Sequence, residues 1–102
     1  MSAIAAARSF LFVPGDRPER FGKALAAGAD QVILDLEDAV APGRKEEARA
    51  AIADWLPTAP RPVLLRVNAA GSACFAADLA ACAHPNVAGI VIPKAEAVEA
   101  LA

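Results

Sequence analysis

Charged and amide side chains follow short apolar runs of the sequence, and they could form a site that binds an anion. The acidic cluster Asp35, Glu37 and Asp38 ends one apolar run, and Arg66 and Asn68 end the next. An arginine can bind a carboxylate through two parallel hydrogen bonds. Carboxylates in turn can orient such an arginine or hold the water molecules of a metal ion. The pattern therefore predicts a carboxylate-binding pocket that contains Arg66.

Arg66 lies within an apolar run, where an unpaired guanidinium would be costly to bury. We expect it either to bind the carboxylate or carbonyl of a substrate or to form a structural ion pair with Asp35 or Glu37. Alternation along a strand places Asp35 and Glu37 on one face, with Asp38 in the following loop. Asp35 is the acid for which we most expect a purely structural role. The whole cluster could also be a capping turn before Pro42.

Other cations could extend this pocket. Arg17 and Lys23 stand in the first loop and the first helix, where they could reach a phosphate or carboxylate or form a solvated helix face. Lys94, which follows Pro93, could close the anion pocket or pair with Glu96. Five charged residues at the start of the second helix are interpreted as a solvated face: Arg44, Lys45, Glu46, Glu47 and Arg49.

The elements that must position these side chains alternate between strand-length apolar runs and helix-length windows. Strands are predicted at 9–13, 31–36, 62–67 and 87–92, and helices at 18–28, 44–56, 73–82 and from Ala95 to the end. Strands of nearly continuous Val, Ile and Leu, each followed by a helix, indicate a parallel sheet buried on both faces.

Two α/β architectures fit this pattern: an open doubly wound sheet, or about four βα units that make the first half of a TIM (β/α)8 barrel. A barrel typically needs about 250 residues, whereas this chain has 102 and ends within a predicted helix, so we expect a truncated barrel. In both architectures functional groups gather at the C-terminal ends of the strands. The charged residues should therefore share one rim.

Composition excludes several classes of protein. The net charge is −2 with no basic run, which argues against nucleic-acid binding. No apolar stretch approaches the roughly 20 residues that span a bilayer. Arg8 follows the apolar N-terminal segment, the reverse of a signal peptide, so we expect a cytoplasmic protein. Cys74 and Cys82, in one predicted helix, would lie about 12 Å apart, too far for a disulfide. His84 is the single histidine, so no metal-ligand spacing is present.

Motifs spread over essentially the whole chain point to one family. They are RSFLFVPGDRPERF at 8–21, DQVILDLEDAV at 30–40, LRVN at 65–68 and IPKAE at 92–96. In this order and spacing they resemble the citrate lyase β-subunit family of the HpcH/HpaI aldolase superfamily, which includes malyl-CoA and citramalyl-CoA lyases.

The resemblance implies a (β/α)8 barrel that forms a trimer or larger homo-oligomer. It also implies Mg²⁺-dependent cleavage or formation of a carbon–carbon bond in a 3-hydroxyacyl-CoA thioester of the citryl-, malyl- or citramalyl-CoA type. The products would be an oxo acid and an acyl-CoA, with CoA as part of the substrate. Subunits of a citrate lyase complex are possible partners.

Residue roles follow from the same resemblance. Arg66 would bind the oxo acid or the substrate carboxylate, and Phe12, Arg17 and Lys23 would line the acyl-CoA or substrate pocket. Glu37 and Asp38 would lie beside the metal site and hold its water molecules or Arg66. The direct metal ligands, a Glu and an Asp, would come from later strands beyond Ala102. Residues 1–102 alone would then be inactive.

Two other functions remain open. One is a class II pyruvate-type aldolase of the same superfamily, acting on hydroxy-oxo acids without CoA. The other is a complete chain that serves as a non-catalytic half-barrel interaction module. Such a module would expose two unpaired strand edges and an apolar inner face, so it would be prone to associate.

Overall fold

The computed structural model describes residues 9–93 and, for the backbone, residues 97–100. Helices and strands alternate along it. In chain order the elements are β1 (Phe10–Pro14), the 3₁₀ helix η1 (Pro18–Arg20), α2 (Phe21–Ala26), β2 (Gln31–Asp35), η2 (Pro42–Arg44), α3 (Lys45–Trp55), η3 (Leu56–Thr58), β3 (Val63–Arg66), α4 (Phe75–Ala81), β4 (Val87–Ile92) and β5 (Ala97–Ala100).

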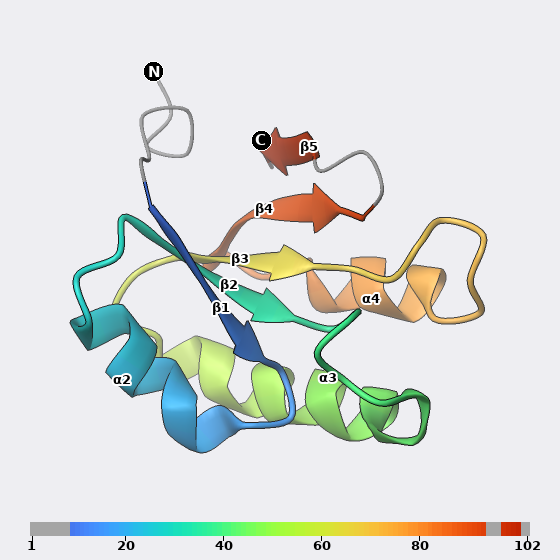
Figure 1. Ribbon diagram of the computed structural model, residues 1–102, viewed down its shortest axis with the longest axis horizontal. Helices are drawn as coiled ribbons and strands as arrows, with labels where there is room; N and C mark the ends of the chain where they lie inside the picture. Colours follow the sequence, from blue (N-terminus) through green and yellow to red (C-terminus); the bar gives the residue numbers. More distant parts are fainter. Residues whose placement is uncertain (1–8, 94–96, 101–102) are drawn as a thin grey trace.

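The strands of this part of the chain form one sheet in the order β1-β2-β3-β4-β5. Pairing from β1 to β4 is parallel, and β5 pairs antiparallel with β4. The helices α2, α3 and α4 lie on the same side of the sheet (Figure 1). A doubly wound sheet would reverse its strand order and carry helices on both faces, whereas a (β/α)8 barrel keeps sequential order with an outer helix layer. The barrel arrangement is therefore confirmed.

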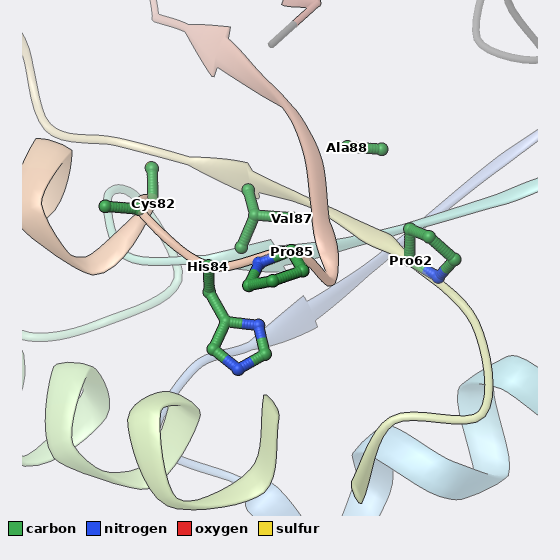
Figure 2. A pocket seen from close by; sticks show the side chains of 7 residues that line it. Pro62, Cys82, His84, Pro85, Val87 and Ala88 are labelled. Carbon is green, nitrogen blue, oxygen red and sulfur yellow. The ribbon is translucent and has the colours of Figure 1, made fainter. Parts of the chain in front are cut away.

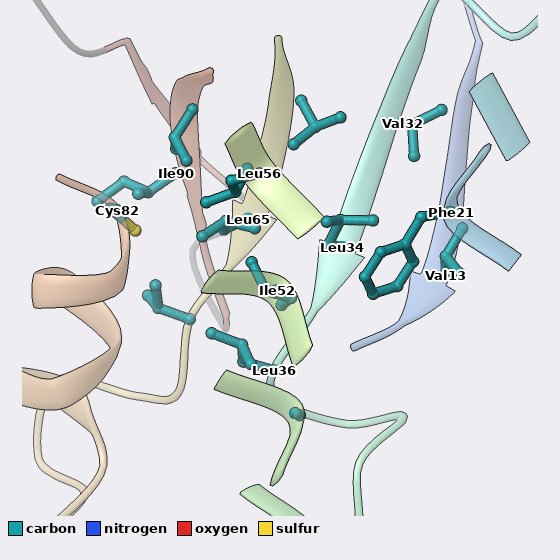
Figure 3. Close-up of a cluster of buried hydrophobic side chains, with 14 of the residues drawn as sticks. Val13, Phe21, Val32, Leu34, Leu36, Ile52, Leu56, Leu65, Cys82 and Ile90 are labelled. Atoms are coloured by element: carbon teal, nitrogen blue, oxygen red, sulfur yellow. The ribbon is translucent and has the colours of Figure 1, made fainter. Parts of the chain in front are cut away.

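The main hydrophobic core fills the space between the sheet and its helices (Figure 3). Alternate residues of each strand point into it, such as Val32 and Leu34 of β2 and Leu65 of β3, all fully buried. The rings of Phe21 in α2 and Trp55 in α3 meet edge to face, with centroids 5.2 Å apart. These contacts fix the helices against the sheet and so set the positions of the strand ends.

The opposite face of the sheet carries the remaining strand residues. Ile33, Leu64 and Val91 form a small buried cluster there, while Phe12 is 45% exposed. In a (β/α)8 barrel this face is the barrel interior. Arg66 and Asp35 have the same parity along their strands as Leu64 and Ile33, and therefore project to this face.

The predicted strands are confirmed to within one residue at each end, and the predicted helices up to α4 to within two. The predicted helix from Ala95 is wrong, because residues 97–100 form the strand β5; residues 94–96 lie outside the described part of the chain. β5 runs antiparallel along β4, with Ile92 opposite Ala97. It pairs backbone N–H and C=O groups that an edge strand would otherwise leave unpaired. Among the described residues no helix is long and apolar enough to cross a membrane.

Candidate functional site at the carboxyl rim of the sheet

The C-terminal ends of neighbouring strands bring the predicted residues to one rim. The sheet register places Pro14, Asp35, Arg66 and Val91 side by side across β1 to β4. Gly15 follows β1 so closely that its N–H donates to the carbonyl oxygen of Asp35 at 2.8 Å. A Cβ at Gly15 would lie 2.8 Å from that oxygen, so this turn requires glycine.

Arg66 and Asp35 form a bidentate ion pair at the centre of this rim. Arg66 Nε donates to Asp35 Oδ1 at 2.9 Å, and Nη2 donates to Oδ2 at 2.6 Å. The amides of Glu37 and Ala39 donate to the same two oxygens at 2.8 and 2.9 Å. The Asp35 side chain is 0% exposed, and that of Arg66 is 18% exposed. The expected structural role of Asp35 is thus matched by four hydrogen bonds to one buried carboxylate.

The charge state of the pair follows from these contacts. Burial raises the pKa of the Asp35 carboxyl, but the hydrogen bonds from Arg66 and from the amides of Glu37 and Ala39 outweigh burial and hold the pKa below its ordinary value. The hydrogen bond to Asp35 raises the pKa of Arg66 in return. Both groups are therefore charged at neutral pH.

Arg66 keeps one edge of its guanidinium available. Its bonds to Asp35 use Nε and Nη2, and Glu37 Oε1 lies 3.8 Å from Nε. The guanidinium carbon lies 4.6 Å from the centroid of the Phe12 ring, a cation–π contact that fixes its plane. Nη1 makes no hydrogen bond to any described residue. This edge can therefore bind a carboxylate while Asp35 holds the other edge.

The loop after β2 brings two more acids close to Arg66. Glu37 is partly buried, Asp38 is exposed, and both negative charges raise the pKa of Arg66. Lys45 binds the same loop, because its Nζ donates to carbonyl oxygens there. Lys45 is therefore wrongly predicted as part of a solvated helix face: three carbonyl oxygens of the loop bind its ammonium, and the residue is partly buried.

A second network of buried hydrogen bonds lies next to the C-terminal end of β3, and the sequence analysis did not predict it. Asp78 of α4 is 0% exposed, and its Oδ2 accepts from the backbone N and the Nδ2 of Asn68 at 2.8 and 2.6 Å. Arg49 Nη1 donates to Oδ1 at 3.0 Å, so Arg49 is also wrongly assigned to a solvated face. Asn68 Nδ2 further donates to the carbonyl of Leu36 at 2.9 Å. Asp78 could have been noticed as the single charged residue in the window 73–82.

The other predicted pocket residues lie in β1 and in the segments that follow it, the next loop and α2. Arg17 is exposed in the loop that follows β1. Lys23 of α2 lines an open hollow of about 310 Å³ along β1, together with Leu11, Phe12 and Arg20. Phe12 thus contacts Arg66 and also borders the Lys23 hollow. Lys94 lies outside the described residues.

A second hollow, of about 570 Å³, opens near the N-terminal ends of β3 and β4 (Figure 2). Cys82 lines it, and burial together with the charge of Asp78 raises the pKa of its thiol to about 11. His84 Nδ1 accepts a hydrogen bond from the backbone N of Asn86 at 3.0 Å. The Cys82 thiol therefore stays protonated at neutral pH, and the hollow lies at the end of the sheet opposite the rim.

No group of three or more His, Cys, Asp or Glu side chains within residues 9–93 is arranged to hold a metal ion. Cys74 and Cys82 are both free thiols. Among the described residues of the rim, the carboxylates of Asp35, Glu37 and Asp38 act on the guanidinium of Arg66.

The family described as HpcH/HpaI aldolase/citrate lyase matches residues 8–102. The chain belongs to this family. The resemblance drawn from the four motifs is thereby confirmed. A citrate lyase subunit beta-like protein of Mycobacterium tuberculosis is 50% identical over 96 residues, which cover 94% of this chain and 34% of that protein. A (3S)-malyl-CoA thioesterase of Cereibacter sphaeroides is 40% identical over 90 residues, covering 85% of this chain and 32% of that protein.

A solved structure also matches the fold of this chain. The protein CitE from Mycobacterium tuberculosis, in complex with magnesium, acetoacetate and coenzyme A, superposes with a TM-score of 0.76 at 49% identity. The match covers 90% of this chain and 34% of that chain. The present chain therefore spans about a third of the length of the relatives it matches.

Proposed function

We propose that the full-length protein is a Mg²⁺-dependent carbon–carbon lyase for a 3-hydroxyacyl-CoA thioester of the citryl-, malyl- or citramalyl-CoA type. The products are an oxo acid and an acyl-CoA. The observation that carries this proposal is the guanidinium of Arg66, fixed by Asp35 and Phe12 with one edge left for a carboxylate. The magnesium, acetoacetate and coenzyme A bound by the related CitE support the same ligand classes.

The reaction makes three demands on the site. The substrate hydroxyl loses its proton, the adjacent carbon–carbon bond breaks to give the oxo acid, and the electron pair of that bond remains on the thioester as an enolate that is then protonated. Bound Mg²⁺ supplies Lewis-acid stabilisation of the oxygen atoms that gain charge. Arg66 binds the carboxylate of the emerging oxo acid and stabilises its charge from a preorganised position. Asp35 keeps Arg66 in that position.

The neighbouring residues have supporting roles in this proposal. Glu37 and Asp38 hold water molecules of the metal or orient Arg66, and the direct metal ligands come from residues outside 1–102. Phe12 and Lys23, which border one hollow, and the exposed Arg17 bind the acyl-CoA or substrate, since cations suit an anionic thioester with a CoA phosphate.

Cleavage assays on the full-length protein test the function. The substrates are malyl-CoA, citramalyl-CoA and citryl-CoA with Mg²⁺, and both the oxo acid and free CoA thiol are measured. A lyase releases the oxo acid without free thiol, whereas a thioesterase, the activity that names one relative, releases thiol. Cleavage of CoA-free hydroxy-oxo acids alone would favour the pyruvate-type aldolase. Absence of oxo acid from every thioester refutes the proposal.

Variants of Arg66 test the site. Arg66→Lys keeps the charge but loses the bidentate fork, a loss of about 1.5–3 kcal/mol for bonds to charged groups, so kcat/KM should fall roughly 10- to 150-fold. The control is Arg44→Ala, because Arg44 is exposed and its ion pairs are with Asp16 and Glu47, neither of which pairs with Arg66. Equal activity in the two variants would refute the role of Arg66.

The larger assembly is part of the same proposal. Residues 1–102 form the N-terminal part of a (β/α)8 barrel, supported by the sequential strand order, the helices on one side and the 34% coverage of the relatives. The protein acts in the cytoplasm as a trimer or larger homo-oligomer, alone or with subunits of a citrate lyase complex. The intact mass of the protein from its native host and the sedimentation of the purified protein test these statements. A native mass of 10.4 kDa would favour the interaction module instead.

A further inference from the structure

Lys45, the first residue of α3, is bound by the chain segment that precedes it. Its Nζ donates to the carbonyl oxygens of Leu36 at 3.0 Å, Glu37 at 2.7 Å and Val40 at 3.1 Å. An ammonium has three N–H donors, so these bonds use its full capacity. Lys45 therefore has no N–H donor left for a ligand.

The segment that carries these carbonyl groups, residues 36–40, is here called the acidic turn. A negative charge binds the backbone amides of the same turn. The carboxylate of Asp35 accepts hydrogen bonds from the amides of Glu37 and Ala39. Thus a cation binds the carbonyl groups of the acidic turn, and an anion binds its amide groups. The anion is also the partner of Arg66, so the acidic turn and Arg66 share one anchor.

The position of Lys45 does not favour its helix. A helix N-terminus carries a partial positive charge and favours acids over cations, and Glu46 and Glu47 follow that rule in the first turn of α3. Lys45 breaks it. The three carbonyl bonds give a reason for a lysine at this position that helix stability does not supply.

We infer that Lys45 is a positioning residue: its ammonium fixes the acidic turn so that Glu37 and Asp38 lie beside Arg66. The geometry that depends on it is the approach of Glu37 Oε1 to within 3.8 Å of Arg66 Nε. Arg66 itself stays anchored by Asp35 when the ammonium is removed. The catalytic consequence rests on the proposed lyase function, but the structural consequence does not.

Lys45→Met tests this inference in the full-length protein, because it removes the ammonium and keeps an unbranched stem. Hydrogen exchange in the acidic turn should become at least tenfold faster, while exchange in β3 stays unchanged. The kcat for thioester cleavage should fall at least tenfold. The KM for the oxo acid, measured in the condensation direction, should change less than threefold because Arg66 is still held.

The matched control is Glu46→Gln, which changes the next residue of α3, exposed to solvent, and should leave exchange and kcat unchanged. Rescue uses Lys45→Cys alkylated with 2-bromoethylamine, which restores an ammonium at nearly the original reach. The wild-type protein receives the same treatment, because Cys74 is also accessible in part. Recovery of both slow exchange and at least half of kcat is expected.

Three results would overturn the inference: unchanged exchange in Lys45→Met, a kcat within twofold of wild type, or an alkylated Lys45→Cys that recovers neither. If Lys45→Met does not fold, Lys45→Gln, which retains two N–H donors on a shorter stem, is measured by exchange in the same way. Failure of the proposed function is seen separately as a wild-type protein inactive on every CoA thioester. The exchange comparison needs no substrate and still decides whether Lys45 holds the acidic turn.

Discussion

Replacement of Asp35 by asparagine is the sharpest perturbation of the rim, because it changes charge and hydrogen bonding with almost no change of shape. Each carboxylate oxygen of Asp35 accepts one bond from Arg66 and one from a backbone amide. Asparagine replaces one oxygen with an NH₂ group, so two donors lose their acceptor and face another donor. One of those donors belongs to the guanidinium of Arg66, which remains charged and largely buried.

The expected cost follows from these losses. An unsatisfied buried polar group costs about 1–3 kcal/mol, and loss of one partner of a buried ion pair costs about 3–5 kcal/mol. We therefore expect Asp35→Asn to lower the free energy of unfolding by about 3–5 kcal/mol. This is a large part of the roughly 5–15 kcal/mol that stabilises a typical domain.

Urea unfolding at pH 7 measures this change, with the slope m compared to show that the transition is still two-state. Asp54→Asn, an exposed position in α3, is the control and should leave the midpoint unchanged. Asp35→Asn combined with Arg66→Met should be less destabilised than Asp35→Asn alone, because the double variant leaves no unpaired buried charge. A loss below about 1 kcal/mol in Asp35→Asn, the size found for exposed ion pairs, would refute the reasoning.

Three other predictions follow from the same structure. Because the folded pKa of Asp35 is lowered, the stability it contributes is fully present above the ordinary pKa of an aspartate, about 3.9, and is lost as pH falls through the folded pKa. The difference in the free energy of unfolding between wild type and Asp35→Asn, measured in urea, should therefore be constant from neutral pH down to about pH 5 and shrink below that ordinary pKa. A difference that does not change with pH would contradict this. Gly15→Ala places a Cβ 2.8 Å from the Asp35 carbonyl oxygen and 3.0 Å from Ile52 Cδ1, so thermal unfolding should show a loss of about 1–3 kcal/mol, whereas Gly22→Ala in α2 meets nothing within 4 Å and should gain about 0.5–1 kcal/mol. The Cys82 thiol, buried and with a pKa of about 11, should be labelled by a thiol reagent at pH 8 far more slowly than the partly exposed Cys74 until the protein is unfolded; equal labelling rates in the folded protein would show that Cys82 is not buried.

The local pattern of the sequence was enough to predict the strands and the helices up to α4, because each is a short apolar run or an amphipathic window. The same reasoning failed beyond Pro93. The composition of residues 97–100, Ala-Val-Glu-Ala, is compatible with a helix. The open edge of β4, however, offers backbone hydrogen-bond partners to an antiparallel strand. A strand edge is a long-range feature, so no window of sequence contains it.

The candidate site was predicted unevenly for a related reason. Arg66 and the acids after β2 could be selected from the sequence, because charged residues at the ends of apolar strands must be paired or exposed. Asp35 was correctly expected to be a structural acid. Lys45 and Arg49, however, look like members of an ordinary charged helix face, and only the path of the preceding loop and the packing of α4 give them partly buried partners.

The sequence by itself determined the α/β class, the family and the side chains that gather at one rim, since these depend on periodicity, motif and strand polarity. The tertiary structure decided between a barrel and a doubly wound sheet, because strand order and the side on which helices pack are not encoded in local periodicity. It also decided which charges are partners. Asp35 with Arg66 and Asp78 with Arg49 join residues from different elements, and the low polarity around them makes those pairings necessary once the chain has brought them together.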